Sequence, residues 1–71
     1  MTLRFHKRIY SRKALLETIE AFRGVADATL STDGDHYVLE VPVPDPAEAD
    51  EIGGEMMNWA LGRTIEQRGE S

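Results

Sequence analysis

Two histidines and a nearby group of carboxylates are the residues whose types could support metal binding or proton transfer. His36 and Glu40 lie four residues apart and follow Asp33 and Asp35, while His6 lies near the start of the chain. Residues four apart on a β-strand are separated by about 13 Å, too far to share one ion. His6 and His36 could approach each other across adjacent strands, but a protein metal site needs three or four converging ligands. We therefore predict no metal site.

No other pattern typical of catalysis is present in the sequence. The chain has no cysteine, which excludes a thiolate nucleophile, a disulfide and an iron–sulfur cluster. There is no glycine-rich phosphate loop, and Gly53-Gly54 lies in an acidic stretch that would repel phosphate. No Ser-His-Asp set can be assembled. We expect a protein that is not an enzyme and that carries no cofactor.

The first element expected from the hydrophobic pattern is a strand over residues 2–10. Apolar residues alternate with polar ones, as in a half-buried strand, at Leu3, Phe5 and Ile9. The outward face would then carry three basic or titratable side chains, Arg4, His6 and Arg8. Lys7 interrupts the inward row, and an inward lysine is a feature of edge strands that resist wrong pairing. The pattern places this strand at or near a sheet edge.

A helix and a β-hairpin are expected next. Ser11 is a suitable N-cap, apolar residues follow at helical spacing, and Gly24 ends the helix. Two short strands then flank Asp33-Gly34, a dipeptide that favours a hairpin turn. Their inward residues would be Ala26, Ala28 and Leu30 on one strand and Tyr37, Leu39, Val41 and Val43 on the other, and their outward residues would include His36, Val38 and Glu40.

The last expected element is helical. Asp45 is a suitable N-cap, Pro46 occupies the first helical position, and Glu48 lies three residues after the cap. Gly53-Gly54 could divide the segment into a short acidic helix and a longer one. The longer helix has a broad apolar surface made of Met56, Met57, Trp59, Ala60, Leu61 and Ile65. Side chains of these types form either core or adaptable interfaces, and Met56, Met57 and Trp59 are candidate partner-binding residues.

These elements predict a single α+β domain over residues 1–71 with the order β-α-β-β-α. A right-handed crossover followed by a hairpin gives a three-stranded antiparallel sheet with the helices on one face, as in half of a ferredoxin-like fold. The first strand would lie at an open edge, and the last helix would be only partly covered. Both features favour association, so we expect a homodimer.

Charge is distributed unevenly along the chain. Residues 1–13 contain five Lys and Arg and no acidic residue, whereas residues 14–71 contain three Lys and Arg against thirteen Asp and Glu, a net charge of -10. The acidic remainder would repel a phosphate backbone, so we expect no nucleic-acid partner. No apolar run is long enough for a membrane span and the first residues do not resemble a signal peptide, which favours a cytoplasmic location without membrane association.

The basic first strand has two interpretations. Arg4, His6 and Arg8 could select an acidic segment of a protein or peptide partner that pairs with the strand. Alternatively, these side chains could balance the acidic helices of the same molecule or of a dimer mate.

The element order and several residues resemble the HxsD-like proteins, small accessory components of the His-Xaa-Ser peptide system. The similarity is carried by Tyr10-Ser11 before ALLETIEAF, by Gly34 before HYVLEV, and by EMMNWALGRTIEQ. Its most specific positions are Tyr10, Ala21-Phe22, Asn58, Leu61 and Ile65, whereas Gly62 stands where the family more often has a polar or acidic residue. The resemblance implies a non-catalytic accessory or adaptor protein that binds a peptide or a radical-SAM enzyme. The alternative function is a small dimeric regulatory domain that binds a ligand at its sheet.

Overall fold

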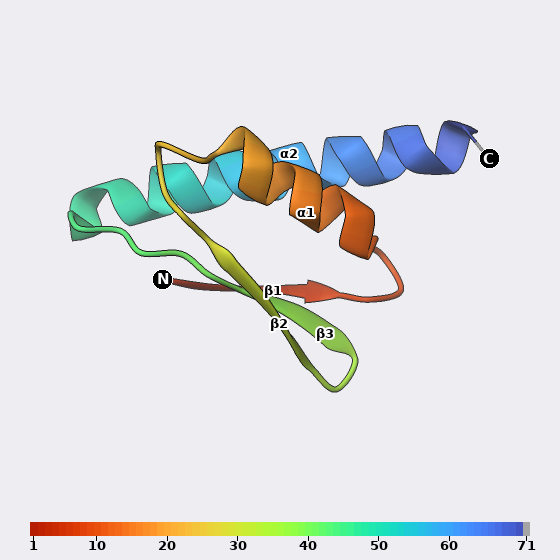
Figure 1. Ribbon diagram of the computed structural model, residues 1–71, viewed down its shortest axis with the longest axis horizontal. Helices are drawn as coiled ribbons and strands as arrows, with labels where there is room; N and C mark the ends of the chain where they lie inside the picture. The colour runs from red at the N-terminus through yellow and green to blue at the C-terminus, as the bar shows by residue number, and fades with distance from the viewer. Residues whose placement is uncertain (71) are drawn as a thin grey trace.

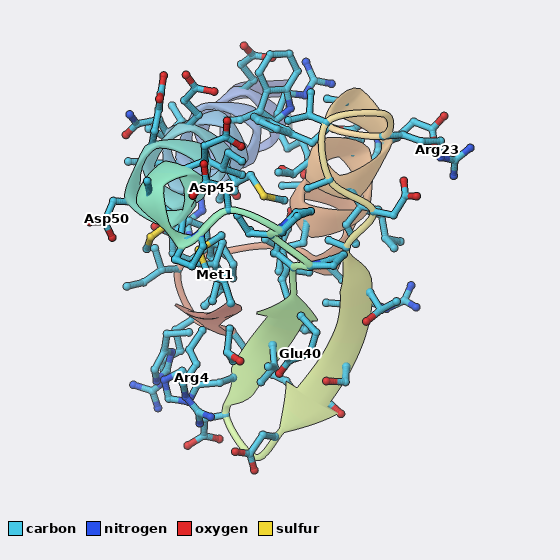
Figure 2. All side chains as sticks on the ribbon, turned by 90° about the vertical axis from the view of Figure 1, so that its left-hand side faces the viewer. Met1, Arg4, Arg23, Glu40, Asp45 and Asp50 are labelled. Carbon is cyan, nitrogen blue, oxygen red and sulfur yellow. The ribbon has the colours of Figure 1, made fainter. Side chains whose placement is uncertain are left out.

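The computed structural model describes residues 1–70 and has the predicted α+β architecture. The elements in chain order are β1 (Thr2–His6), α1 (Arg12–Ala21), β2 (Thr29–Asp33), β3 (His36–Glu40), the 3₁₀ turn η1 (Pro46–Glu48) and α2 (Ala49–Glu70). The strand order is β1-β3-β2, and both pairings are antiparallel. The two helices cover the same face of the sheet, with α2 on the β1 side and α1 on the β2 side (Figures 1 and 2).

β1 ends earlier than its sequence pattern predicted. The chain turns at residues 7–9, where the His6 carbonyl accepts hydrogen bonds from the N–H groups of Ile9 and Tyr10, both at 3.0 Å. Arg8 therefore lies in this turn, and its predicted place on the outward face beside Arg4 and His6 was wrong. The alternation continues past the strand in the sequence, but the turn hydrogen bonds end the extended backbone.

The inward row of β1 consequently ends at Phe5. Lys7 and Ile9, which were expected to point inward as well, are both exposed in the turn, and Ile9 is 49% exposed. Tyr10 covers this end of the core instead, because its ring packs edge-on against Phe5 with the centroids 4.9 Å apart.

β2 and β3 form the predicted hairpin, joined by Gly34 and Asp35. Gly34 has a φ of +58°, which fits the first central position of a type II′ turn, where glycine is favoured. β2 begins later than predicted, so Ala26 and Ala28 lie in the loop before it. Both alanines are nevertheless buried.

The predicted capping residues occupy their expected places. The Ser11 hydroxyl accepts a hydrogen bond from the Ala14 N–H at 3.1 Å at the start of α1, and Gly24 follows the helix with a φ of +97°. The Asp45 carboxylate accepts from the Ala47 N–H at 3.0 Å. This last cap begins η1, which leads directly into α2.

α2 runs without interruption through Gly53 and Gly54, so the division that these glycines could have caused does not occur. Gly53 lies against the first strand: a Cβ there would be 3.1 Å from Met1 Sδ and 3.5 Å from Leu3 Cδ2. Glycine costs a helix interior about 1 kcal/mol relative to alanine. The close packing of α2 on the start of β1 offsets that cost and keeps the helix intact.

The core lies between the sheet and the two helices. It contains Phe5, Leu15, Ala26, Ala28, Leu39, Val41, Met56 and Ala60.

A polar network fixes α1 to α2 beside this core. The Glu17 carboxylate accepts hydrogen bonds from Arg63 Nε and Gln67 Nε2, both at 2.9 Å, and Gln67 Oε1 accepts from the Ser11 hydroxyl at 2.6 Å. The hydrogen bond from Arg63 lowers the pKa of Glu17 below its ordinary value of 4.5. The network therefore links the second half of α2 to the first half of α1.

Candidate partner-binding surface

β1 is an edge strand, as predicted, because β3 pairs with one side of it and no described strand lies on the other. Met1 and Val41 exchange backbone hydrogen bonds of 2.7 and 2.8 Å at one end of this pairing, and Lys7 N–H donates to the Asp35 carbonyl at 2.9 Å at the other. Hydrogen-bonded pairs recur at every second residue of an antiparallel ladder. The odd-numbered residues of β1 therefore face β3, and the even-numbered residues direct their backbone groups to the open edge.

The open edge is short but accessible. Thr2 and Arg4 each direct an N–H and a C=O toward it, and His6 directs an N–H. The His6 carbonyl is occupied by the turn that follows. An added strand could thus pair with β1 over residues 2–6 and no further.

Arg4 projects from the sheet face that the helices leave uncovered. Its guanidinium contacts the Asp33 carboxylate of β2 at 3.1 Å and so reaches across β3. Both side chains are more than half exposed, so the ion pair contributes little stability. Beneath it, Val38 is only 7% exposed, although the sequence placed it on the outward face. The charge of Arg4 is balanced by the hairpin, not by the acidic helices.

His6 and His36 lie directly opposite each other on the same face, with ring centroids 4.9 Å apart. His6 Nδ1 accepts a hydrogen bond from the Arg8 N–H at 3.1 Å, which occupies one of its two nitrogens. Among the side chains that the structure describes, no three of His, Cys, Asp or Glu gather closely enough to hold a metal ion.

The three apolar candidates of α2 have different environments. Met56 is fully buried in the core, so its side chain cannot contact a partner. Trp59 is 46% exposed and packs edge-on against Phe22, with ring centroids 6.3 Å apart, on the flank of α2 that faces α1. Met57 is 39% exposed and lies on the opposite flank.

Met57 belongs to a line of exposed apolar side chains, the Met57 stripe, formed by Met57, Leu61 and Ile65. The latter two are 40% and 59% exposed. Residues four apart on a helix are neighbours, and this spacing could have selected Leu61 and Ile65 from the predicted apolar surface as partner-binding candidates. Asp50, two helical turns before Met57, points away from α1 on the β1 side (Figure 2). Met57, seven residues after Asp50, therefore lies on the β1 side of α2, and Leu61 and Ile65 are each turned about 40° further round the helix, toward solvent.

The two ends of the molecule carry opposite charge. Residues 45–55, in η1 and the first half of α2, include five acidic residues and no Lys or Arg. The opposite end contains the basic residues of segment 7–13, and there Arg68 Nη2 donates to the carbonyls of Arg8 and Ile9 at 2.9 and 2.8 Å. Figure 1 shows that α2 and β1 run in the same direction, so these ends are separated along the longest axis, 39 Å in extent.

Comparisons with known proteins found no matching family model, no similar curated protein and no similar solved structure. The resemblance to the HxsD-like proteins therefore stays a prediction. Neither helix in the described part of the chain combines the length and apolar character needed to cross a membrane.

Proposed function

We propose that this chain is a non-catalytic accessory or adaptor protein that binds an extended segment of a protein or peptide as a fourth strand beside β1. The observation that supports it is the open edge of β1 on the same side of the molecule as the exposed Met57, the first residue of the Met57 stripe. Backbone hydrogen bonds to Thr2 and Arg4 would supply affinity, while alternate side chains of the bound segment supply specificity.

The segment that fits this surface alternates apolar and acidic residues. Its side chains on the helix-covered face would pack against Met57, at the start of the Met57 stripe. Those on the other face would lie beside Arg4 and His6, with the basic segment 7–13 at one end. Such exposed charges act mainly on the association rate and its salt dependence.

The resemblance noted in the sequence gives this proposal a specific form. The partner would be a precursor peptide with His-Xaa-Ser repeats, or the radical-SAM enzyme that modifies it, and this chain would present one to the other. The absence of cysteine from the sequence agrees with an accessory role that does not involve holding a cluster.

A second candidate is a small dimeric, ligand-binding regulatory domain, and the charge distribution favours it. Two copies paired antiparallel through β1 would place the acidic residues 45–55 of one beside the basic segment 7–13 of the other. The same pairing brings two copies of Arg4 close together. Because Arg4 is exposed and already paired with Asp33, this repulsion is small.

The test uses the backbone N–H of Arg4, which points to the open edge of β1. Arg4→Pro removes an N–H that points to the open edge, and proline is tolerated on edge strands. Arg4→Gln removes the charge but keeps the N–H, which makes it the matched control. The probes are a displayed library of random ten-residue peptides and a synthetic peptide with His-Xaa-Ser repeats, with binding measured by biolayer interferometry.

We expect selected peptides to alternate apolar and acidic residues, to bind Arg4→Gln more slowly than wild type, and not to bind Arg4→Pro. Unchanged affinity for a folded Arg4→Pro variant would overturn strand addition. Sedimentation velocity separates the second candidate: a dimer that persists in Arg4→Gln and dissociates in Arg4→Pro supports it, and a monomer at high micromolar concentration excludes it.

A further inference from the structure

The sheet has a second open edge, formed by β2, on the side away from β1. β3 pairs with one side of β2, and no described strand pairs with the other. The turn at Gly34-Asp35 makes Asp33 and His36 the first hydrogen-bonded pair of the hairpin, and such pairs recur at every second residue. The odd-numbered residues of β2 therefore bond to β3, whereas Leu30 and Thr32 direct their backbone N–H and C=O groups to the open edge.

The two open edges differ in the residues that discourage pairing. Natural edge strands are protected from unwanted association by charged side chains, by proline or by bulges. β1 carries Arg4, and Lys7 follows its end. Residues 29–32 of β2 include no charged residue and no proline, and β2 pairs with β3 without a bulge along its whole length. Pairing at the β2 edge therefore meets none of these obstacles.

A partly exposed apolar flank of α1 lies on the same side of the molecule as this edge. Glu17 faces α2, because it binds Arg63 of that helix. Ile19 is turned about 160° round the helix from Glu17 and so lies on the flank away from α2. Leu16 lies about 60° from Ile19, toward solvent, and is 42% exposed. Because α1 covers the β2 side of the sheet (Figure 2), this flank is on the side of the β2 edge.

A second copy of this chain complements the β2 edge. An antiparallel pairing can place a two-fold axis at Ser31, so that the Ser31 residues of the two copies lie opposite each other. The residues that face the open edge then pair with each other, Leu30 of one copy with Thr32 of the other. Thr29 lies opposite Asp33 at both ends of the pairing. No two like charges therefore face each other, in contrast to pairing through β1.

The polar side chains of this pairing also form hydrogen bonds. The chain already contains such a combination: Thr2 lies opposite Glu40, and its hydroxyl donates to the carboxylate at 2.9 Å. Thr29 opposite Asp33 of the second copy repeats it, with a hydroxyl facing a carboxylate across two strands. A carboxylate accepts several hydrogen bonds, so Asp33 also keeps its contact with Arg4.

The pairing keeps the helices of both copies on one face of a continuous sheet. Leu30 lies opposite the buried Leu39 and points to the helix-covered face, as does Thr32 two residues later. Directly opposite residues of antiparallel strands carry their side chains on the same face, so the two helix layers lie side by side. The exposed flank of α1 in one copy then faces the same flank in the other, which covers Leu16 and Ile19.

We propose that two copies of this chain associate through β2, antiparallel and centred on Ser31, with the α1 flanks packed against each other. Both β1 edges then stay open, at the two ends of the joined sheets. The dimer is therefore a bivalent binder, and a partner with two extended segments gains affinity through the effective concentration of the second. This consequence rests on the proposed function, whereas the dimer itself does not, so the two can fail separately.

The first test compares prolines at the two edges by sedimentation velocity of the full chain up to high micromolar concentration. Thr32→Pro removes an N–H at the β2 edge, and Arg4→Pro removes one at the β1 edge, where proline is tolerated in each case. Thr32→Val keeps the N–H and the shape of the side chain, which makes it the matched control. Circular dichroism checks that each variant is folded.

We expect wild type, Thr32→Val and Arg4→Pro to dimerise equally. Thr32→Pro should dimerise about tenfold more weakly or less, because two hydrogen bonds are lost per dimer. A monomeric wild type overturns the proposal, as does an unweakened dimer of folded Thr32→Pro. Growth into longer chains also overturns it, because it would show that β1 of one copy pairs with β2 of the next.

The second test places charges at the two-fold axis. Ser31 is exposed, so Ser31→Lys and Ser31→Glu should both fold. Each variant alone sets like charges opposite each other and should dimerise about tenfold more weakly than wild type at low ionic strength. An equal mixture sets opposite charges there and should form a heterodimer. A mixture that associates no better than the separate variants overturns the proposal.

Discussion

The two flanks of α2 differ in what covers them. On one flank, Trp59 packs against Phe22, and Arg63 binds Glu17, so side chains of α1 contact α2 through both apolar and polar groups. On the other flank, Leu61 and Ile65 continue the line begun by Met57 and are 40% and 59% exposed. One helix thus has one flank fixed by its neighbour and another that remains open.

The difference follows from the topology of the sheet. α1 lies over the β2 side of the sheet and α2 over the β1 side (Figure 2). β3 pairs with one edge of β1, and no described strand pairs with the other edge. A fourth strand beside β1 would lie on the side of α2 that carries Met57. The sheet edge is open and the flank of α2 is exposed because no fourth strand lies beside β1. Both features favour the binding of an added strand at this place.

The largest contrast is expected between two adjacent methionines. Met56→Ala should lower the free energy of unfolding by about 2–5 kcal/mol, because it leaves a cavity in the core. Met57→Ala should change it by no more than about 0.5 kcal/mol, because the side chain lies on the open flank. Urea denaturation followed by circular dichroism measures both. Similar losses in the two variants would show that the open flank is covered in solution, as in a dimer.

A smaller effect is expected from the two glycines. A Cβ at Gly54 would meet no atom within 4 Å, so Gly54→Ala should stabilise the protein by about 1 kcal/mol through helix propensity. Gly53→Ala gains the same propensity but pushes against Met1, so its net gain should be smaller. Thermal unfolding of the two single variants tests the order. A larger gain for Gly53→Ala would mean that α2 does not pack closely on β1.

The smallest expected effect concerns the Glu17–Arg63 pair, on the flank of α2 that α1 covers. It changes the free energy of unfolding only at acidic pH. Because Arg63 lowers the pKa of Glu17 below 4.5, the folded state binds this proton less readily than the unfolded state. The resulting stabilisation is fully present above pH 4.5 and is lost as the pH falls through the folded value. The measurement is the midpoint of urea denaturation at a series of pH values. In Glu17→Gln and in Arg63→Gln, this midpoint should fall less steeply below pH 4.5 than it does in wild type. A midpoint that falls as steeply as that of wild type in both variants would contradict this origin.

Several features were predictable from the sequence because they depend on neighbouring residues. The Ser11 and Asp45 caps, the turn at Gly34 and the order of the elements follow from hydrogen bonds and backbone angles set within a few positions. The edge position of β1 also followed, since a right-handed crossover and a hairpin permit few topologies. The candidate surface was predicted in part, through Arg4, His6 and the apolar character of α2.

Other features depended on which elements come together in space. The alternation through Ile9 matched a strand, but the chain turns at residues 7–9, where Arg68 of α2 donates to the Arg8 and Ile9 carbonyls, and Arg8 lies off the sheet. Gly53 matched a helix break until packing against Met1 favoured a continuous helix. Hydropathy could not separate buried Met56 from exposed Met57. Nor could it separate Thr18, whose buried hydroxyl donates to a backbone carbonyl, from Thr64, whose buried hydroxyl has no hydrogen-bond partner within the described residues. Local sequence determined the backbone of each element, because caps and turns are short-range. Only the tertiary structure decided burial and hydrogen-bond satisfaction, because both depend on distant neighbours.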